Sequence, residues 1–224
     1  MTEMQMGGNI TLSSATLLAT LSWDPRPGVP AVDASALLLD ERGVVGSEAD
    51  FVFYNQPQHP SGAVVLSSTT PGANTLDIDL ARIPAATTRV VLAASADGGT
   101  FGQVPALRIE LADRAAAGAL VAAFAMHAAD ETAFLAAEIY RRGGQWKFRA
   151  VGQGYSTGLA GLARDFGIDV TGSDAPASPP PPAPAAPSAP AAPPAPPAPP
   201  EPAAPPAPAR QDREPGYDPL LDLG

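Results

Sequence analysis

The chain has 224 residues, a formal net charge of −10 and no cysteine. The acidic charge disfavours binding to phosphate backbones and anionic lipid, and the lack of cysteine excludes a disulfide framework, a thiolate zinc site and a cysteine nucleophile. No run approaches the ~20 apolar residues that span a bilayer. We therefore expect no nucleic-acid partner, no membrane insertion and a cytoplasmic location.

Proline divides the chain into a body and a tail. Eight of the 28 prolines fall in residues 1–174, and the other twenty fall in 175–224. A body of this size can bury one hydrophobic core, whereas a segment made largely of proline and alanine cannot. We predict a folded domain over 1–172, a disordered Pro/Ala-rich linker over 173–209 and an acidic-hydrophobic peptide over 210–224.

Short apolar or β-branched runs recur along the body. Alternating polar and apolar residues over 9–24 predict two strands that break near Ser13 and Ser14. Further runs predict strands at 34–39, 51–55, 63–67, 75–80, 89–95, 104–111 and 119–125. This pattern, with only one convincing helix, predicts an all-β fold: a β-sandwich of two mainly antiparallel sheets with one short C-terminal helix.

Residues 132–142 and 145–151 predict an antiparallel hairpin. Apolar and basic side chains alternate in the second run, as in a half-buried strand. Gly143 and Gly144 between the runs suit the positive φ angles of a tight hairpin turn. A helix over residues 131–142 is the competing local interpretation.

After this hairpin the chain is expected to change direction and enter the helix. Glycine enters unusual φ regions at low cost, so we expect the change of direction at Gly152, Gly154 and Gly158. A helix is predicted over residues 157–166, with Thr157 as its N-cap and Gly167 just past its end.

The sequence GYSTG at 154–158 matches the nucleophile-elbow pattern of serine hydrolases and lies between a predicted strand and a predicted helix. The other members of a triad do not fit, because in that fold the acid and the histidine follow the serine. The chain has only His59 and His127, and both precede Ser156. A serine hydrolase using Ser156 is therefore a remote alternative, and we expect no catalytic residues.

The histidines and the acidic loops are further candidates for metal ligands. His127 near Asp130 and Glu131 lacks a second nitrogen or sulfur ligand for zinc, so both histidines are interpreted as structural loop residues. Calcium needs six to eight oxygen ligands, usually including several carboxylates. The candidate loops surround Asp33 and span residues 67–77.

Several segments together resemble the TerD family of tellurium-resistance and stress-response domains. They are SWDPR (22–26), VDASALLLD (32–40), ADFVFYNQP (49–57), FGQV (101–104), ETAFLAAEIYRRGGQWKFRAVGQGY (131–155) and FGIDV (166–170). The resemblance covers about residues 7–170. It implies a bacterial protein with a two-sheet β-sandwich, a role in tellurite or general stress resistance, and acidic loops associated with calcium.

Residue by residue, the implied calcium site is degenerate. Asp33 matches the second acidic position of the family's first motif, but Ala31 stands at the first. A Ser-Ser-Thr run at 67–69 replaces the family's Gly-Asp-Asn segment, and the acidic stretch after it is shortened. Asp33 and Asn74 remain as a remnant site, with Asp77 on the following strand outside it.

The end of the tail regains charge and apolar side chains. We expect four of its residues to bury apolar surface on a protein partner: Tyr217, Leu220, Leu221 and Leu223. The sequence thus predicts a non-catalytic TerD-like binding or adaptor module without a cofactor. A weak calcium-binding sensor is the alternative.

Overall fold

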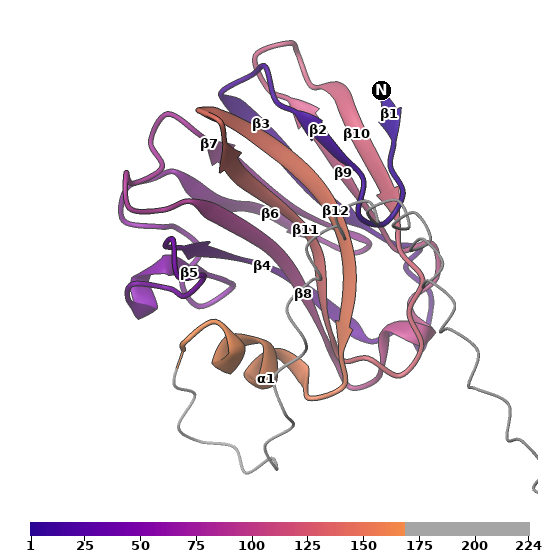
Figure 1. The fold of residues 1–224 in the computed structure, drawn as a ribbon. Coiled ribbons are helices and arrows are strands. Elements are labelled where there is room, and N and C mark those ends of the chain that lie inside the picture. Colours follow the sequence, from indigo (N-terminus) through magenta and orange to yellow (C-terminus); the bar gives the residue numbers. More distant parts are fainter. Residues whose placement is uncertain (169–224) are drawn as a thin grey trace, which may run out of the picture. The chain divides into compact units, whose positions relative to one another are not determined.

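The computed structural model describes residues 1–168, which form twelve strands and one α-helix (Figure 1). Two single 3₁₀ turns occur at Glu48–Asp50 and Phe101–Gln103. The strands are β1 (Thr2–Glu3), β2 (Asn9–Thr11), β3 (Thr16–Ser22), β4 (Ala31–Leu39), β5 (Phe51–Val52), β6 (Val64–Thr70), β7 (Ala73–Asp79), β8 (Arg89–Asp97), β9 (Arg108–Asp113), β10 (Ala119–Ala125), β11 (Ala133–Arg142) and β12 (Gln145–Tyr155), and the helix is α1 (Gly158–Asp165).

The strands form two six-stranded sheets that stack as a sandwich (Figure 1). Sheet A has the order β1-β10-β9-β3-β7-β6, and sheet B has the order β2-β12-β11-β8-β4-β5. Neighbouring strands are antiparallel except β1 and β10, which run parallel. The prediction of an all-β sandwich with mainly antiparallel sheets and one short helix is confirmed.

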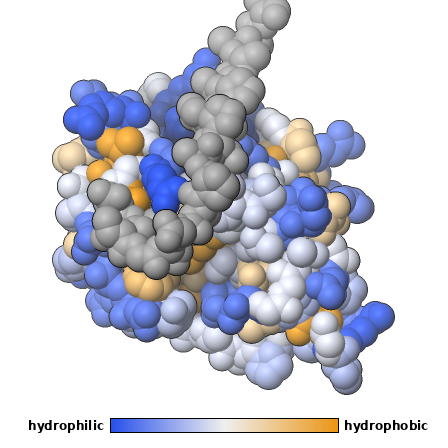
Figure 2. All heavy atoms as spheres, turned by 90° about the horizontal axis from the view of Figure 1, so that it is seen from below, coloured by the Kyte–Doolittle hydropathy of each residue, from blue (hydrophilic) through white to orange (hydrophobic). Residues whose placement is uncertain are grey.

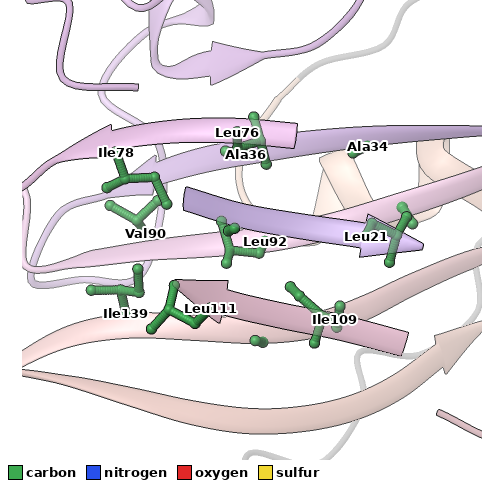
Figure 3. Close-up of a cluster of buried hydrophobic side chains, with 14 of the residues drawn as sticks. Leu21, Ala34, Ala36, Leu76, Ile78, Val90, Leu92, Ile109, Leu111 and Ile139 are labelled. Atoms are coloured by element: carbon green, nitrogen blue, oxygen red, sulfur yellow. The ribbon is translucent and has the colours of Figure 1, made fainter. Parts of the chain in front are cut away.

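The main core lies between the two sheets. Strands of both sheets alternate side chains, so every second residue points inward. Figure 3 shows such residues from sheet A and sheet B facing one another: Leu21, Leu76, Ile78, Ile109 and Leu111 from sheet A, and Ala34, Ala36, Val90, Leu92 and Ile139 from sheet B.

The N-terminal segment joins the two sheets at one side of the sandwich. β1 pairs with β10 of sheet A, and β2 pairs with β12 of sheet B, so residues 4–8 cross from one sheet to the other (Figure 1). The predicted pair of strands over 9–24 is confirmed as β2 and β3. Sequence patterns did not indicate β1, because two residues are too few to show a period.

The predicted hairpin is confirmed, and the competing helix over 131–142 is wrong. β11 and β12 pair from Arg142↔Gln145 outward. Gly143 and Gly144 have φ values of 60° and 76°, as the tight turn requires.

β12 is longer than expected, because Gly152 and Gly154 lie inside it. The register shifts between Leu135 and Ala137, where one extra residue of β12 forms a β-bulge. Gly152 in this bulge has a φ of +71°. The glycine therefore kinks the strand without ending it, and the chain leaves the sheet only near Gly158.

Helix α1 begins after Thr157 and ends at Asp165, within one residue of the prediction at each end. Thr157 occupies the N-cap position, but its hydroxyl makes no capping hydrogen bond. Gly167 has a φ of +84°, and the N–H groups of Gly167 and Ile168 donate to the carbonyls of Arg164 and Ala163. This is the Schellman ending that the glycine predicted.

The helix covers part of the outer face of sheet B with a second apolar cluster. Leu162 and Ala163 of α1 are buried against this face, with Leu37, Val91 and Leu135 among the sheet residues of the cluster. Where it is not drawn in grey, the side of the molecule seen from below is mostly hydrophilic or neutral, with small separate hydrophobic areas (Figure 2). Sheet B is therefore covered on both faces where α1 lies.

Several segments differ from the sequence interpretation; the predicted 104–111 strand, for example, is β9 and begins only at Arg108. Only Phe51–Val52 of the predicted 51–55 strand pairs in a sheet, because Phe53 and Gln56 form their own small bridge. Residues 67–77 are not an open loop but the β6–β7 hairpin, which turns at 71–72. Asp77 lies on β7, as expected, and pairs with Arg114 at 3.0 Å.

The linker over 173–209 and the peptide over 210–224 lie outside the described residues. Among residues 1–168, no helix is long and apolar enough to cross a bilayer.

The turn around Gly102 generates a stability prediction. A Cβ at this position would lie 2.2 Å from the carbonyl oxygen of Ala129, which also accepts the hydrogen bond from the Gly102 N–H at 2.8 Å. Gly102→Ala should lower the free energy of unfolding by about 3 kcal/mol, because overpacking against backbone adds to loss of this bond. Urea unfolding of the wild-type chain and the variant measures this difference in free energy.

The matched control is Gly98→Ala. Gly98 has a φ of +80°, and nothing lies within 4 Å of the position that an alanine methyl would occupy, so only backbone strain applies. That strain costs about 1–2 kcal/mol. If both variants lost the same free energy of unfolding, the close approach of residue 102 to the carbonyl of Ala129 would not restrict the side chain at that position.

Candidate functional site

The outer face of sheet B carries acidic and hydroxyl side chains where β4 begins. Val32 and Ala34 of β4 are buried in the main core. Because successive side chains of a strand point to opposite faces, Asp33 and Ser35 lie on the outer face, as Leu37 does further along the strand. Strand alternation alone fixes this placement.

A cross-strand row extends this polar end across sheet B. Asp33 lies opposite Ser95 of β8, Ser95 opposite Ala133 of β11, and Ala133 opposite Tyr155 of β12. Directly opposite residues share one face of a sheet. The row therefore runs from a carboxylate on β4, past the buried apolar Ala133, to the Tyr155 side chain, which packs against the apolar cluster under α1.

Asp97 of β8 supplies a second carboxylate at this end. It lies opposite Ala31 and is a diagonal neighbour of Asp33, on the same face, with Cα atoms about 7–8 Å apart. Burial raises the pKa of Asp33, and repulsion from Asp97 raises that pKa further. Within residues 1–168, no ion pair involves either side chain. The Asp33–Asp97 pair thus forms an acidic spot that a cation would stabilise.

The hydroxyl of Ser35 lies on the same face, one position further into the sheet. Ser35 is 2% exposed, and its oxygen has no hydrogen-bond partner among the described residues. An unsatisfied buried polar group costs about 1–3 kcal/mol. The polar end of the face therefore includes a buried oxygen as well as the two carboxylates.

The oxygen donors of this end match a hard cation such as calcium in type but not in number. Calcium takes six to eight oxygens, several of them usually carboxylates. No group of three or more His, Cys, Asp or Glu side chains that could hold a metal occurs in residues 1–168. The Asp33–Asp97 pair would supply two carboxylates, and backbone carbonyls and water would have to supply the rest.

The structure does not bring the two predicted calcium ligands together. Asn74 of β7 is 1% exposed in the core between the sheets, and its side-chain amide donates to the carbonyl of Val32 at 2.8 Å. Asp33 points away from that core on the other face of β4. The structure therefore places Asn74 between sheet A and sheet B, and it places Asp97 rather than Asn74 next to Asp33.

Sequence reasoning missed Asp97. The apolar run predicts a strand that ends at residue 95, which leaves Asp97 in the turn before Gly98. The observed β8 extends to Asp97, which places it two residues from Ser95 and on the same face. The signal in the sequence was the two-residue spacing of Ser95 and Asp97. Residues two apart share one face of a strand, so this spacing could have indicated that the strand continues to Asp97.

Tyr155 and Asp165 form the other end of the polar row. Burial raises the pKa of Tyr155 to about 12, and repulsion from Asp165 contributes. Burial also raises the pKa of Asp165. The phenol stays protonated at neutral pH, so Tyr155 can donate a hydrogen bond but does not act as a base.

Ser156 lies between β12 and α1, as the elbow pattern predicts, but it has no triad. The His59 ring contacts Asp50 at 3.0 Å and Ser61 at 2.8 Å, and His59 is 4% exposed. Among the described residues, no hydrogen bond joins Ser156 to either histidine. His59 is a satisfied structural residue, as the sequence interpretation proposed.

The remaining candidate residues belong to the tail. Tyr217, Leu220, Leu221 and Leu223 lie outside the described residues, so their predicted contact with a partner stays a prediction.

Known proteins place this architecture in context. The TerD domain matches residues 1–166. Tellurium resistance protein TerD of Serratia marcescens is 35% identical over 189 residues, covering 75% of this chain and 98% of that protein. General stress protein 16U of Bacillus subtilis (strain 168) is 35% identical over 151 residues, covering 62% and 78%.

Solved structures agree on the fold. A homologue of telluride resistance protein (TerD) from Streptomyces coelicolor A3(2) superposes with a TM-score of 0.54 at 20% identity, covering 67% of this chain and 96% of that one. At this identity the likeness concerns the fold alone.

The Asp33–Asp97 pair generates a pH-dependent stability prediction. Because the pKa of Asp33 is raised on folding, the folded chain holds its proton more tightly, and stability falls as pH rises from about 4 through the raised pKa. Asp33→Asn should therefore increase the free energy of unfolding at pH 7 by about 0.2–1 kcal/mol, a range that allows for solvent screening, and should have no such effect near pH 3.

Denaturant unfolding between pH 3 and 7 in chelator-treated buffer measures this effect. Asp77→Asn is the matched control, because Asp77 is paired with Arg114 and its loss should not stabilise the chain. A gain from Asp33→Asn that is equally large at pH 3 would contradict the electrostatic explanation.

Proposed function

This chain belongs to the TerD family, and we propose that it is a tellurium- or stress-resistance protein that acts by binding, as an adaptor module, without catalysis of its own. The observation that carries the proposal is the TerD domain over residues 1–166, followed in the same chain by a tail of distinct composition. The domain supplies the resistance function implied by the names of its relatives. The tail supplies a route to a partner.

The absence of catalysis is supported by the surroundings of Ser156. A serine nucleophile needs an adjacent base, and the base needs an orienting group. The ring contacts of His59 are with Asp50 and Ser61, and among the described residues no hydrogen bond joins Ser156 to a histidine. The small Ser156 side chain instead suits the change from β12 to α1.

The partner is proposed to be a protein that receives the terminal peptide 210–224. This peptide combines three leucines and Tyr217 with acidic neighbours, whereas the preceding linker is mostly proline and alanine. Apolar anchors on an extended acidic segment suit docking into a groove of another protein. The proposal includes a cytoplasmic location and excludes nucleic acid, because the net charge of −10 repels phosphate.

Weak calcium binding is the second candidate function, and the Asp33–Asp97 pair favours it. The pair holds two carboxylates on one face without a cationic side chain paired to them within residues 1–168. Affinity rises with the number of carboxylates and the rigidity of the site. Two carboxylates on rigid strands therefore suit millimolar rather than micromolar calcium.

Genetic complementation tests the adaptor proposal. In the source organism lacking this gene, the full chain and its Ser156→Ala variant should restore growth under tellurite or the relevant stress equally well. A chain ending at Ala209, and the double variant Leu220→Asp with Leu221→Asp, should restore much less growth at equal protein levels. Loss of protection by Ser156→Ala would favour an enzyme, and full protection by the shortened chain would refute the docking peptide.

Thermal unfolding in calcium tests the second candidate. Millimolar calcium should raise Tm of the full chain while equal magnesium does not, because a ligand that binds only the folded state stabilises it. Asp33→Asn and Asp97→Asn should each abolish the shift. Asn74→Ala should lower Tm by removing the bond to Val32 yet keep the calcium shift, and loss of the shift in that variant would return Asn74 to the site.

A further inference from the structure

A groove opens between the two sheets where the N-terminal segment crosses from β1 to β2. It has a volume of about 330 Å³, and its lining includes Met4, Met6, Met126 and His127 together with Phe124 and Gly152. The first residues of the chain, the end of β10 and the bulge of β12 meet here. These segments are far apart in sequence, so only the folded chain forms the groove.

The lining concentrates sulfur and imidazole side chains. The chain has four methionines and two histidines, and three of the methionines and one histidine line this groove. Met4 and Met126 are each 7% exposed and form the inner wall, whereas Met6 is 69% exposed. Met4 and Met126 also belong to the main core, whereas Met6 and His127 line the groove as exposed residues, which core packing does not explain.

Backbone hydrogen bonds hold the methionines in place. The N–H of Met4 donates to the carbonyl of Ala123 at 2.7 Å, and that of Met126 donates to Leu107 at 2.9 Å. The N–H of Gly7 donates to the carbonyl of Ala150 at 2.8 Å, which brings Met6 to the bulge of β12. Backbone bonds just outside β1 and β10 therefore position Met4 and Met126, whose side chains also pack in the main core, and the Gly7 bond positions the turn that carries Met6.

Gly152 provides the space that the groove needs. A Cβ at this position would lie 3.2 Å from the terminal methyl carbon of Met6 and 3.0 Å from the ring of Phe124. Any larger residue would push Met6 and Phe124 away from the bulge. The glycine in the bulge of β12 thus leaves room for the methyl group of Met6 and the ring of Phe124.

Three thioethers and an imidazole form a soft, uncharged ligand set. Thioether sulfur prefers Cu(I) and similar soft ions, whereas calcium and magnesium prefer oxygen, and the absence of cysteine leaves no thiolate to compete. Methionine has three rotatable bonds, so its sulfur can turn toward an ion without moving the backbone. The acidic net charge of the chain attracts cations in general.

We propose that Met4, Met6, Met126 and His127 form a binding site for a soft monovalent metal cation, of the Cu(I) or Ag(I) class. The buried pair Met4 and Met126 forms the floor of the site. Met6 and His127 close it from the solvent side. The site lies on a different part of the sandwich from the Asp33–Asp97 pair and takes the opposite class of ion.

Titration with Ag(I), an air-stable ion of this class, tests the site in the full chain. With methionine labelled at its methyl carbon, one equivalent of Ag(I) should shift the methyl resonances of Met4, Met6 and Met126 and the ring resonances of His127. A chain carrying Tyr54→Met gives the control, because Tyr54 is 60% exposed and outside the groove. The methionine introduced there should not shift at one equivalent.

Competition with the chromogenic chelator bicinchoninate measures Cu(I) affinity. Met6→Leu and His127→Gln should each weaken binding at least about tenfold, since each removes one ligand, while Tyr54→Met leaves the affinity unchanged. Both altered residues are exposed, so these variants keep the fold. Unchanged affinity in the double variant, no methyl shifts, or shifts of exposed methionines without Met4 and Met126 would overturn the proposal.

Discussion

The burial of sheet B on both faces is the constraint on which the rest of the structure depends. β4 and β8 must supply apolar side chains inward to the core between the sheets and outward to the cluster under α1. A shift of one residue in register would exchange the two sets of side chains completely. The position of every polar residue on these strands follows from that alternation.

The outer face of sheet B is consequently divided by charge. At one end, Glu138 of β11 is 4% exposed and is paired with Arg149 at 2.8 Å and Arg89 at 3.6 Å. At the other end, the carboxylates of Asp33 and Asp97 share the face without such a partner in residues 1–168. The same surface therefore has one end where a buried carboxylate is paired with two arginines, and another end where two carboxylates repel each other. The apolar contacts of α1 lie on this face as well.

Local sequence patterns predicted many turns and element ends of this fold, because residues that are adjacent in the sequence determine these features. The Gly143-Gly144 turn, the break near Ser13 and the end of α1 at Gly167 each need only a few adjacent residues. The failures lie where pairing extends beyond the local pattern. β1 is too short to show a period. Residues 67–77 contain residue types that favour a loop, but most of them pair as strands in the β6–β7 hairpin.

The sequence by itself determined the family, through several segments that resemble TerD domains, and the two-sheet class, because alternation and glycine turns are properties of the chain. Only the tertiary structure decided which side chains meet. It separated Asn74 from Asp33 by placing them on opposite sides of β4, joined Asp33 to Asp97, and gathered three methionines at one opening. The physical reason is that strand register and sheet stacking join residues that are far apart in the chain, and these long-range contacts leave no local pattern in the sequence.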